Sequence, residues 1–495
     1  MTEKVKKDGA RMWILLWCLG LAGQFCWNLE NQWFNTFVYA KIGKDPSIIT
    51  GMLICSAAAT TFSTFFFGTW SDRKGNRRTF IGVGYILWGL FTIAFGLTEF
   101  IPKDLFELAA VMVVLADTVM SFFGSMANDS CFNAWTNDIM HDGNRGQIGA
   151  ALATQPVMGT LLGTIIGGYL VGDHDNYMRL FLVIGGAVIL FGILSLITMG
   201  KRDDVEPSVR GSFWKQFGSV FNFKKFFRMH ELVALLFSMM FFAIGWNGCY
   251  AYMGNYLIYY LKFSPSQMGL IQAIPLIVAM LASIPVARLI NRNKHFGIGV
   301  ISILCAAAGM LMLVPIKPGS VNTGTIWNWY LLLSVFIMGV GYVAFLQMAR
   351  VWAKQLFPKD SRGQFEGIWI LFFVLIPMIG GALLSQSVLQ TSGEMFRDVE
   401  SGRMQYIPNG NIFLAGGIVI LVALIPLLFT RKYFKARISA GDPASVEIPA
   451  DSSSEASGVV EVSEPETLEE AGKVFNAEDV PEPDSIQEPK GSGQS

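Results

Sequence analysis

Residues 68–78 have the sequence GTWSDRKGNRR and lie between two long apolar segments. Gly68 permits a close approach of two helices, and Gly75 permits a tight turn. Asp72 is able to pair with a base or with the N-terminus of a neighbouring helix, and a charge pair that breaks during rocking would control which side opens. The basic residues of the stretch are Arg73, Lys74, Arg77 and Arg78. We predict a short, charged gating connection between two membrane helices; the alternative is that the basic cluster only fixes topology.

The composition of the chain places this connection in a polytopic membrane protein. Hydrophobic residues make up 52% of the 495 residues, charged residues make up 15%, and the mean hydropathy is +0.45. A helix needs about 20 apolar residues to cross a bilayer. We predict twelve such spans, at residues 12–38, 47–70, 79–98, 106–135, 147–170, 179–199, 232–261, 266–290, 297–315, 327–353, 364–388 and 411–430.

The basic residues predict the orientation of these spans. If the N-terminus is cytoplasmic, the inside segments before the C-terminal tail hold 27 Lys or Arg residues, and the outside loops hold eight. This asymmetry favours that orientation, because basic loops are retained in the cytoplasm. We therefore expect a multi-pass protein of the cell membrane, surrounded by lipid, with both termini in the cytoplasm.

Three short sequences recur in the same order and at nearly constant separation along the chain. The recurring stretches are Trp27-Asn28 with Trp246-Asn247, Pro46-Ser47 with Pro265-Ser266, and residues 145–147 with residues 362–364. Weak similarity between halves is typical of transporters whose site lies at their interface. We predict an all-α integral membrane fold, in which twelve helices form two parallel, pseudo-symmetric six-helix bundles.

The domain boundaries follow from the same pattern. We predict an N-terminal bundle at residues 1–199, a cytoplasmic linker at 200–231, a C-terminal bundle at 232–440, and an acidic, disordered cytoplasmic tail at 441–495, which holds 14 Asp or Glu and two Lys. In the linker, one face of a short helix either lies in the headgroup region or belongs to a solvated connection. The aromatic and aliphatic residues of that face are Phe213, Trp214, Phe217, Val220 and Phe221.

The connection at residues 68–78 resembles the cytoplasmic signature of the major facilitator superfamily, with Asn76 where a basic residue is common. Residues 128–147 look like the corresponding stretch of the glycoside-pentoside-hexuronide cation symporters. That family usually carries acids in helix 2 and helix 4 for its coupling cation, whereas the second span here has none and Asn128 stands at the helix 4 position. The resemblance implies a cation-coupled transporter, and this departure from the family pattern counts against sodium coupling, so H⁺ is favoured over Na⁺. Arg145 and Arg362, which begin the repeated Arg-Gly-Gln triplet, join the predicted gating residues.

The first span carries a stripe of amides at helical spacing. Gln24, Asn28, Asn31 and Asn35 share one face, beside Trp27. Because amides are costly against lipid, the stripe must face a cavity or another helix. We predict that it lines the substrate cavity; the alternative is that the amides join helices as interhelical contacts.

Three other spans are predicted to complete the cavity, namely the fourth, seventh and tenth. The fourth presents polar residues on one face, and the seventh presents Trp246 beside a shared polar face. The corresponding candidate ligand-binding residues are Asn128, Trp246, Asn247, Tyr250 and Gln347. Amides and tryptophan faces suit a neutral polyhydroxylated solute, so a sugar or glycoside is the expected substrate.

Transport of this solute is expected to depend on a gradient. Glu30, Asp117 and Asp129, in that order, are the candidate coupling acids, because a buried acid is able to exchange protons. We predict alternating access with proton symport through Glu30. The alternatives are facilitated uniport and drug/proton antiport by the same fold.

Other classes of protein have less support. No phosphate-binding loop occurs in the sequence, the four His residues lie in or beside loops, and the six Cys residues fall in apolar spans without a CxxC. A polytopic membrane enzyme would need a converging catalytic group. We therefore expect no enzymatic activity, no cofactor, no metal site and no nucleic-acid partner.

Overall fold

A computed structural model describes most of the chain. The described residues are 9–141, 143–172, 175–200, 203–207, 212–218, 226–292, 294–357, 362–398 and 402–439. They belong to one compact unit. The predicted tail at 441–495 lies outside the described residues, and the predicted domain boundaries remain predictions.

Twelve helical segments among the described residues are long and apolar enough to cross a membrane, which confirms the predicted spans. They are Ala10–Ile42, Pro46–Lys74, Arg77–Phe100, Lys103–Asp138, Gln147–Val171, Tyr177–Thr198, His230–Tyr260, Pro265–Ile290, His295–Leu313, Trp329–Leu356, Gly367–Ser392 and Asn411–Phe434.

Several spans are built from more than one helical piece. The first consists of α1 (Ala10–Asn28), the π-helical η1 (Leu29–Phe34), α2 (Asn35–Phe37) and the π-helical η2 (Val38–Ile42). The fourth contains α5 (Phe106–Gly124), the π-helical η5 (Ser125–Phe132) and α6 (Asn133–Asp138), and the seventh contains α11 (His230–Asn255) and the π-helical η8 (Tyr256–Tyr260). The eleventh contains α15 (Arg362–Ile370), the π-helical η10 (Leu371–Leu375) and α16 (Ile376–Ser392).

The remaining spans are mostly single helices. They are α3 (Pro46–Lys74), α4 (Arg77–Leu97), α7 (Arg145–Val171), α8 (Tyr177–Thr198), α12 (Pro265–Asn291), α13 (His295–Leu313) and α14 (Trp329–Leu356), and the twelfth span is divided into α17 (Asn411–Val422) and α18 (Leu424–Ser439).

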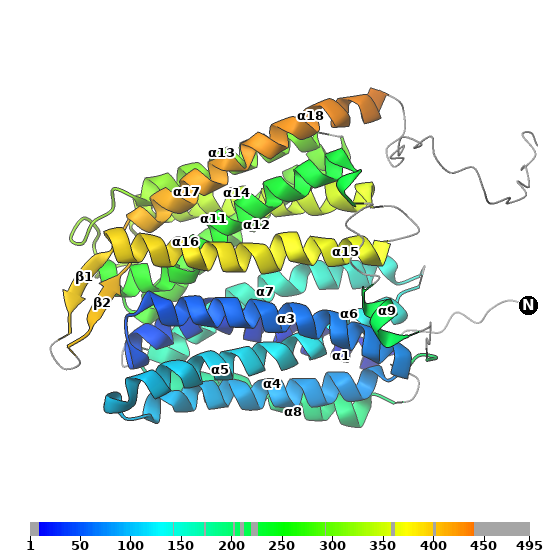
Figure 1. Cartoon of the computed structure of the whole chain (residues 1–495), viewed down its shortest axis with the longest axis horizontal. Coiled ribbons are helices and arrows are strands. Elements are labelled where there is room, and N and C mark those ends of the chain that lie inside the picture. Colours follow the sequence, from blue (N-terminus) through cyan, green and yellow to red (C-terminus); the bar gives the residue numbers. More distant parts are fainter. Residues whose placement is uncertain are drawn as a thin grey trace, which may run out of the picture. The chain divides into compact units, whose positions relative to one another are not determined.

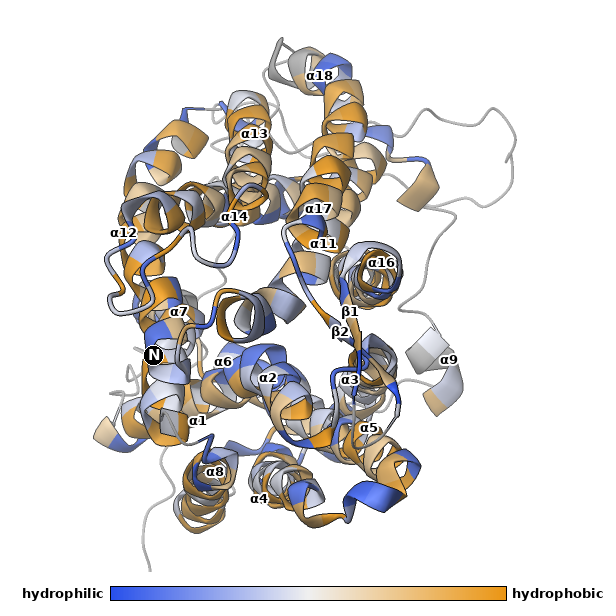
Figure 2. Ribbon diagram, turned by 90° about the vertical axis from the view of Figure 1, so that its left-hand side faces the viewer, coloured by the Kyte–Doolittle hydropathy of each residue, from blue (hydrophilic) through white to orange (hydrophobic). Residues whose placement is uncertain are grey.

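The helices run side by side and form two groups. Seen nearly end-on, α1 to α8 lie together in the lower part of the picture and α11 to α18 in the upper part (Figure 2). We call these groups the first and second halves. The start of α1 and the short helix α9 (Phe213–Gly218) lie at one end of the helices, and strands β1 (Glu394–Arg397) and β2 (Met404–Ile407) lie at the other (Figure 1). We call these the signature end and the hairpin end.

Helix starts at the hairpin end repeat between the halves. Asp45 caps α3 by accepting a hydrogen bond from the Ser47 N–H, and Pro46 is the first residue of the helix. Ser264, at the equivalent position of the second half, caps α12 in a capping box, and Pro265 follows it. Both caps satisfy N–H groups that a helix start leaves without partners. The recurrence of Pro-Ser therefore reflects a repeated helix start.

The two strands form a hairpin that the sequence did not predict. They pair antiparallel, with Glu394 opposite Ile407. The hairpin belongs to the second half but contacts the first: the Tyr406 N–H donates to the Lys44 carbonyl at 2.8 Å, and Arg403 pairs with Glu107 at 2.7 Å. The hairpin thus joins the two halves at their hairpin end.

The linker between the halves is described only in part. Within it, α9 lies beside α3, and the Phe213 ring is 5.4 Å from the Phe66 ring (Figure 1). The side chains of Phe217, Val220 and Phe221 lie outside the described residues. The packing of Phe213 is compatible with both alternatives for the linker.

Within the first half, α4 and α8 pack through glycines, which generates a test of the packing. A Cβ added at Gly185 would come within 2.8 Å of the Gly89 carbonyl oxygen, whereas a Cβ added to the next residue, Gly186, would meet nothing within 4 Å. We expect Gly185→Ala to destabilise the protein by about 1–3 kcal/mol through overpacking. Gly186→Ala should be neutral or stabilise it by up to about 1 kcal/mol, because alanine favours helix. Thermal unfolding of the two variants in the same detergent is the measurement, and equal losses would contradict this packing.

Candidate functional site

A cavity lies between the two halves, and we call it the central cavity. It encloses about 450 Å³, including space that opens to solvent. Its walls are α7 of the first half and α11, α12 and α14 of the second. The polar lining consists of Thr160, Thr164 and Gln272, and the aromatic lining consists of Trp246 and Tyr250. We predicted that spans 1, 4, 7 and 10 line the cavity. Spans 7 (α11) and 10 (α14) do so, but the rest of the described lining comes from spans 5 (α7) and 8 (α12) rather than from spans 1 and 4.

A chain of polar contacts connects this cavity to the first span. The Asn28 amide donates to the Thr164 hydroxyl at 3.2 Å, and that hydroxyl lies 3.0 Å from Gln32 Oε1. The amides of Gln32 and Gln272 both point at the sulfur of Met268, at 3.6 and 2.9 Å. A thioether is a weak acceptor, so a ligand oxygen would be a better partner for the Gln272 amide. Sequence reasoning missed Thr164, Gln32 and Gln272. Gln32 lies four residues after Asn28, a spacing that could have identified it, whereas Gln272 is an isolated polar residue on an apolar span.

Three of the predicted ligand residues hold helices together in this structure. Asn28 is buried, and its Oδ1 lies where a Cβ on Gly163 of α7 would approach to 2.6 Å. Asn128 is also buried; its Oδ1 accepts a hydrogen bond from the Tyr85 hydroxyl at 3.1 Å. Gln24 packs against Gly159 in the same close manner. These contacts correspond to the interhelical alternative, since an amide in an apolar medium takes the nearest protein partner.

The π-helical pieces of the first span explain why its amide stripe divides. Asn31 is exposed, and its amide donates to the Trp27 carbonyl at 2.7 Å, whereas Asn35 is buried. A π-helical turn takes up an extra residue, so positions that share a face on an ideal α-helix separate here. Trp27 itself is half-buried, with its ring 5.0 Å from that of Trp88.

The predicted residues of the second half have mixed placements. Trp246 and Tyr250 line the central cavity. One face of the Trp246 ring is covered by Tyr342, whose ring lies 3.8 Å away and nearly parallel, while Tyr250 lies 5.7 Å away. Asn247 packs against Gly381 of α16, and the buried Gln347 Oε1 has no hydrogen-bond partner among the described residues. Neither Asn247 nor Gln347 is among the described lining residues of the cavity.

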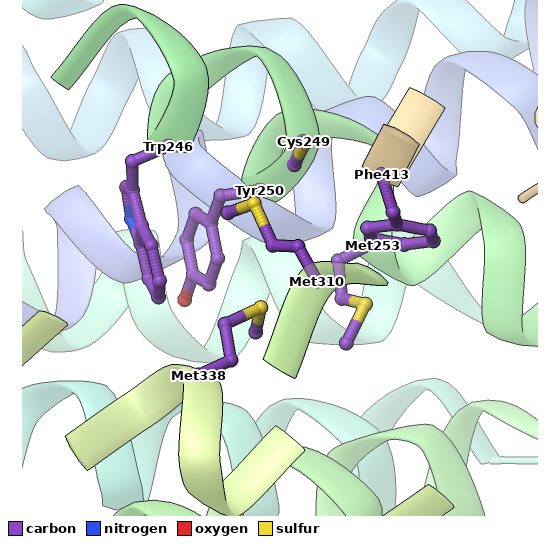
Figure 3. Close-up of a pocket in the computed structure, with 7 residues that line it drawn as sticks. All are labelled: Trp246, Cys249, Tyr250, Met253, Met310, Met338 and Phe413. Atoms are coloured by element: carbon purple, nitrogen blue, oxygen red, sulfur yellow. The ribbon is translucent and has the colours of Figure 1, made fainter. Parts of the chain in front are cut away.

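A second, smaller cavity adjoins the first inside the second half. It comprises about 170 Å³ of space between side chains of α11, α13, α14 and α17, including any space that opens to solvent (Figure 3). We call it the thioether pocket. Its lining consists of Trp246, Cys249, Tyr250, Met253, Met310, Met338 and Phe413.

The three predicted coupling acids lie in the first half. Glu30 on η1 and Asp117 on α5 are both buried and are connected by Ser121, whose hydroxyl is 3.0 Å from Glu30 Oε1 and 2.8 Å from the Asp117 carbonyl oxygen. Within the described part of the chain, Glu30 Oε2 and Asp117 Oδ1 have no hydrogen-bond partner. Asp129 on η5 accepts from Ser125 at 3.1 Å and from the Asn128 amide at 3.2 Å. Asp129 is thus better hydrogen-bonded than the other two acids.

The signature connection at residues 68–78 forms a charge network. Arg77 is buried and contacts Asp72 Oδ1 at 2.7 Å, Asp138 Oδ2 at 2.9 Å and the Ser71 hydroxyl at 2.6 Å. These partners come from α3 and from α6 at the end of the fourth span. The predicted charge pair of Asp72 is therefore present, and it lies within the first half.

The glycines and the unusual asparagine of this connection have distinct roles. Gly75 has φ +67°, and a Cβ there would meet the Val205 carbonyl oxygen at 2.1 Å, so glycine is required. At Gly68 the nearest atom to an added Cβ is Ser130 Oγ at 3.5 Å, so alanine would fit and the predicted need for glycine is not evident. Asn76 caps α4 by accepting from the Thr79 N–H. A capping amide explains an uncharged residue at this position.

The other predicted gating residues are described to different extents. Arg78 donates its backbone N–H to Asp204 at 3.2 Å. Arg73 is half-buried at the end of α3. Arg145 and Arg362 are the first residues of α7 and α15, and their side chains lie outside what the structure describes.

Two tryptophans at the signature end occupy equivalent positions in the two halves. The Trp135 indole donates to Asp203 at 3.4 Å, and Asp203 also pairs with Arg11 at 2.9 Å. Trp352, near the end of the tenth span as Trp135 is near the end of the fourth, donates to Glu231 at 2.7 Å. Both halves therefore fix the end of this span through an indole and an acid, although the acids come from different segments.

At the hairpin end, the first and seventh spans meet closely. The Asn255 amide donates to the Asn35 carbonyl at 3.2 Å, and the Tyr259 hydroxyl donates to the Thr36 carbonyl at 3.4 Å. A Cβ on Gly254 would lie 2.7 Å from Thr36 Cγ2. We call these five residues the hairpin-end seal. In the register of the repeat, Asn35 and Thr36 correspond to Gly254 and Asn255, so equivalent segments contact each other.

The chain matches a known family over most of its length. A model described as Major Facilitator Superfamily matches residues 12–327 and residues 235–470. The chain belongs to the major facilitator superfamily. No curated protein matches its sequence. The family and the structural neighbours are transporters, not enzymes.

Solved structures share the fold of this superfamily member at low sequence identity. The nucleoside transporter NupG is 14% identical with a TM-score of 0.62, and the match covers 85% of this chain and 98% of that one. A bacterial homolog of the human lysosomal transporter Spinster, inward-facing and unoccupied, is 14% identical with a TM-score of 0.63, covering 89% and 100%. A D-xylose-proton symporter is 14% identical with a TM-score of 0.61, covering 85% and 98%. These likenesses establish the fold.

The charge network at residues 68–78 generates a prediction about stability. Arg77→Gln removes the cation between Asp72 and Asp138, and we expect a loss of about 1–3 kcal/mol, because hydrogen bonds to charged groups contribute this much and the partly exposed partners are screened. Arg78→Gln is the matched control, since Arg78 contacts Asp204 through its backbone, which the substitution leaves in place. Thermal unfolding of the purified variants is the measurement. Equal stability of the two variants would contradict a stabilising role for this charge network.

Proposed function

We propose that this chain is a secondary active transporter that moves a small polar solute, a sugar or glycoside, by alternating access together with a proton. The observation that carries the proposal is the central cavity, whose lining combines Thr160, Thr164 and Gln272 with the rings of Trp246 and Tyr250. Transporter cavities of this kind are formed between the halves near the middle of the membrane.

The lining of the cavity matches the chemistry of a sugar ring. Hydroxyl groups need both donors and acceptors, which two threonine hydroxyls and an amide provide. The C–H faces of the ring are apolar and pack on aromatic carbon. Because Tyr342 covers one face of Trp246 at 3.8 Å, the solute would pack on the part of the ring that Tyr342 leaves uncovered. The D-xylose-proton symporter among the structural neighbours is compatible with this class of solute.

Glu30 and Asp117 are proposed as the coupling site. The Ser121 hydroxyl contacts the Glu30 carboxylate and the backbone carbonyl of Asp117, which places the two buried acids near each other, and among the described residues Glu30 Oε2 and Asp117 Oδ1 have no hydrogen-bond partner. Like charges in an apolar site disfavour ionisation of both groups together. A bound proton removes one charge, so the occupied site favours a closely packed first half.

Polar contacts of the first span connect the proposed coupling site at Glu30 and Asp117 with the central cavity. Glu30 lies between Asn28 and Gln32, and both of these amides contact Thr164 on the cavity wall. A change of charge at Glu30 therefore acts on the turn of helix that carries these amides. With the N-terminus in the cytoplasm, the hairpin-end seal faces outward, and ligand contacts from both halves would drive the change between states.

Glu30→Gln tests the coupling. In proteoliposomes, we expect the variant to lose proton uptake driven by the solute while it keeps counterflow of labelled solute, because glutamine fills the site but carries no titratable proton. Asp104→Asn, in the exposed connection before α5, is the matched control and should behave as wild type. Intact proton uptake in the Glu30 variant would contradict coupling through this residue, and would favour another acid or uniport.

A further inference from the structure

We propose that the thioether pocket is a subsite for an apolar substituent of the transported solute, so that the preferred solute is a glycoside with an aryl or alkyl group rather than a free sugar. This inference rests on the proposed function and names the class of substrate. It requires that the pocket is continuous with the central cavity, that its surface is apolar, and that it is able to admit a ring.

The two cavities share a wall of side chains. Trp246, Tyr250, Met253 and Met338 line both of them. The first three lie on α11 at spacings of four and three residues, so they occupy one face of the helix. Figure 3 shows these shared side chains gathered around the same space as the remaining residues of the pocket. A substituent on a solute in the central cavity therefore reaches the pocket by passing these side chains.

The part of the pocket beyond this wall is apolar. It is formed by Cys249, Met310 and Phe413. The Cys249 thiol donates to the Ile412 carbonyl at 3.2 Å, and the Phe413 ring packs edge-on against Tyr256 at 4.8 Å. The thiol is thus already engaged with the protein, and none of the three offers a partner to a hydroxyl group. A sugar ring buried here would lose hydrogen bonds to water without replacement, which is unfavourable.

Methionine side chains make the pocket adaptable. The space between these side chains has no room for a water molecule as it stands, so a ring enters only when some of them move. Met253, Met310 and Met338 surround this space (Figure 3). Methionine is unbranched, changes rotamer readily, and makes favourable sulfur contacts with aromatic rings. The pocket is therefore suited to aryl or alkyl groups of different shape.

The orientation of the solute follows from the two linings. Thr160, Thr164 and Gln272 belong to the central cavity alone, and Met310 and Phe413 belong to the thioether pocket alone. A glycoside would place its hydroxyl groups against the first set and its aglycone against the second. The shared rings of Trp246 and Tyr250 would lie at the glycosidic linkage.

The test compares matched pairs of ligands. Methyl and phenyl β-glycosides of glucose, galactose and xylose are titrated against the full chain in nanodiscs, with binding measured by calorimetry. For the sugar that binds, we expect the phenyl glycoside to bind roughly 10- to 100-fold more tightly than the methyl glycoside, as is typical for an apolar group that fills a specificity pocket.

Variants of Met310 locate the effect. Met310→Gln makes the pocket polar and should remove most of the preference for the phenyl glycoside. The affinity for the methyl glycoside should not change, because Met310 lines the thioether pocket but is not among the described lining residues of the central cavity. Met312→Gln, on the same helix but not among the described lining residues, is the matched control and should retain the preference. Met310→Leu keeps the surface apolar and should retain it too, and this variant remains informative if the glutamine variant does not fold.

The results distinguish a failure of the proposed subsite from a failure of the proposed transport function. Equal affinity for the two members of a binding pair, or an equal effect of Met310→Gln on both, overturns the subsite and leaves the transport of glycosides standing. Failure of every pair to bind to a folded wild-type protein overturns the proposed function, and the assignment of the pocket to an aglycone falls with it.

Discussion

The close contact of the first and seventh spans at the hairpin end is the constraint on which the rest of the structure depends. Gly254 has no side chain, so Thr36 packs directly against the α11 backbone, and the Asn255 amide reaches the Asn35 carbonyl at 3.2 Å. Because these segments are equivalent in the two halves, the seal lies where a pseudo-two-fold relation brings a surface against its own counterpart. Uncharged amide, hydroxyl and methyl groups make a contact that holds the halves together but is able to separate.

The two halves have the same helices but different chemistry. Glu30 and Asp129 lie on the π-helical segments η1 and η5, and the equivalent stretches of the second half are ordinary α-helix. π-Helical turns are frequent at functional sites, because they redirect side chains. In the second half, Cys249 replaces Glu30, and aromatic and thioether groups line the cavities. The proposed cation site and the proposed aglycone site thus lie in different halves, joined by the wall that carries Thr164 and Gln272.

Much of the fold was predictable from the sequence, for identifiable reasons. Long apolar spans and repeated helix starts such as Pro46-Ser47 follow from local chemistry. The charged loop turns at Gly75, where the positive φ favours glycine. The strands at Glu394–Arg397 and Met404–Ile407 were not predicted, since short exposed strands carry little hydrophobic pattern. The site was less predictable. An asparagine such as Asn28 suits a ligand contact and an interhelical contact equally well, and only its packing against Gly163 in the structure distinguishes these two roles. Gln272 carries no signal in one sequence, because its importance comes from the poor acceptor, Met268, that the fold places beside it.

The most direct test of the account is a reversible crosslink across the hairpin-end seal. Thr36→Cys and Gly254→Cys together place two thiols at a contact where an added Cβ lies 2.7 Å from Thr36 Cγ2, close enough for a disulfide. The single variants and the wild type, which has six cysteines of its own, receive the same oxidant. We predict that the crosslinked double variant loses counterflow and recovers it on reduction. Full transport by protein shown to be crosslinked would contradict alternating access through this seal.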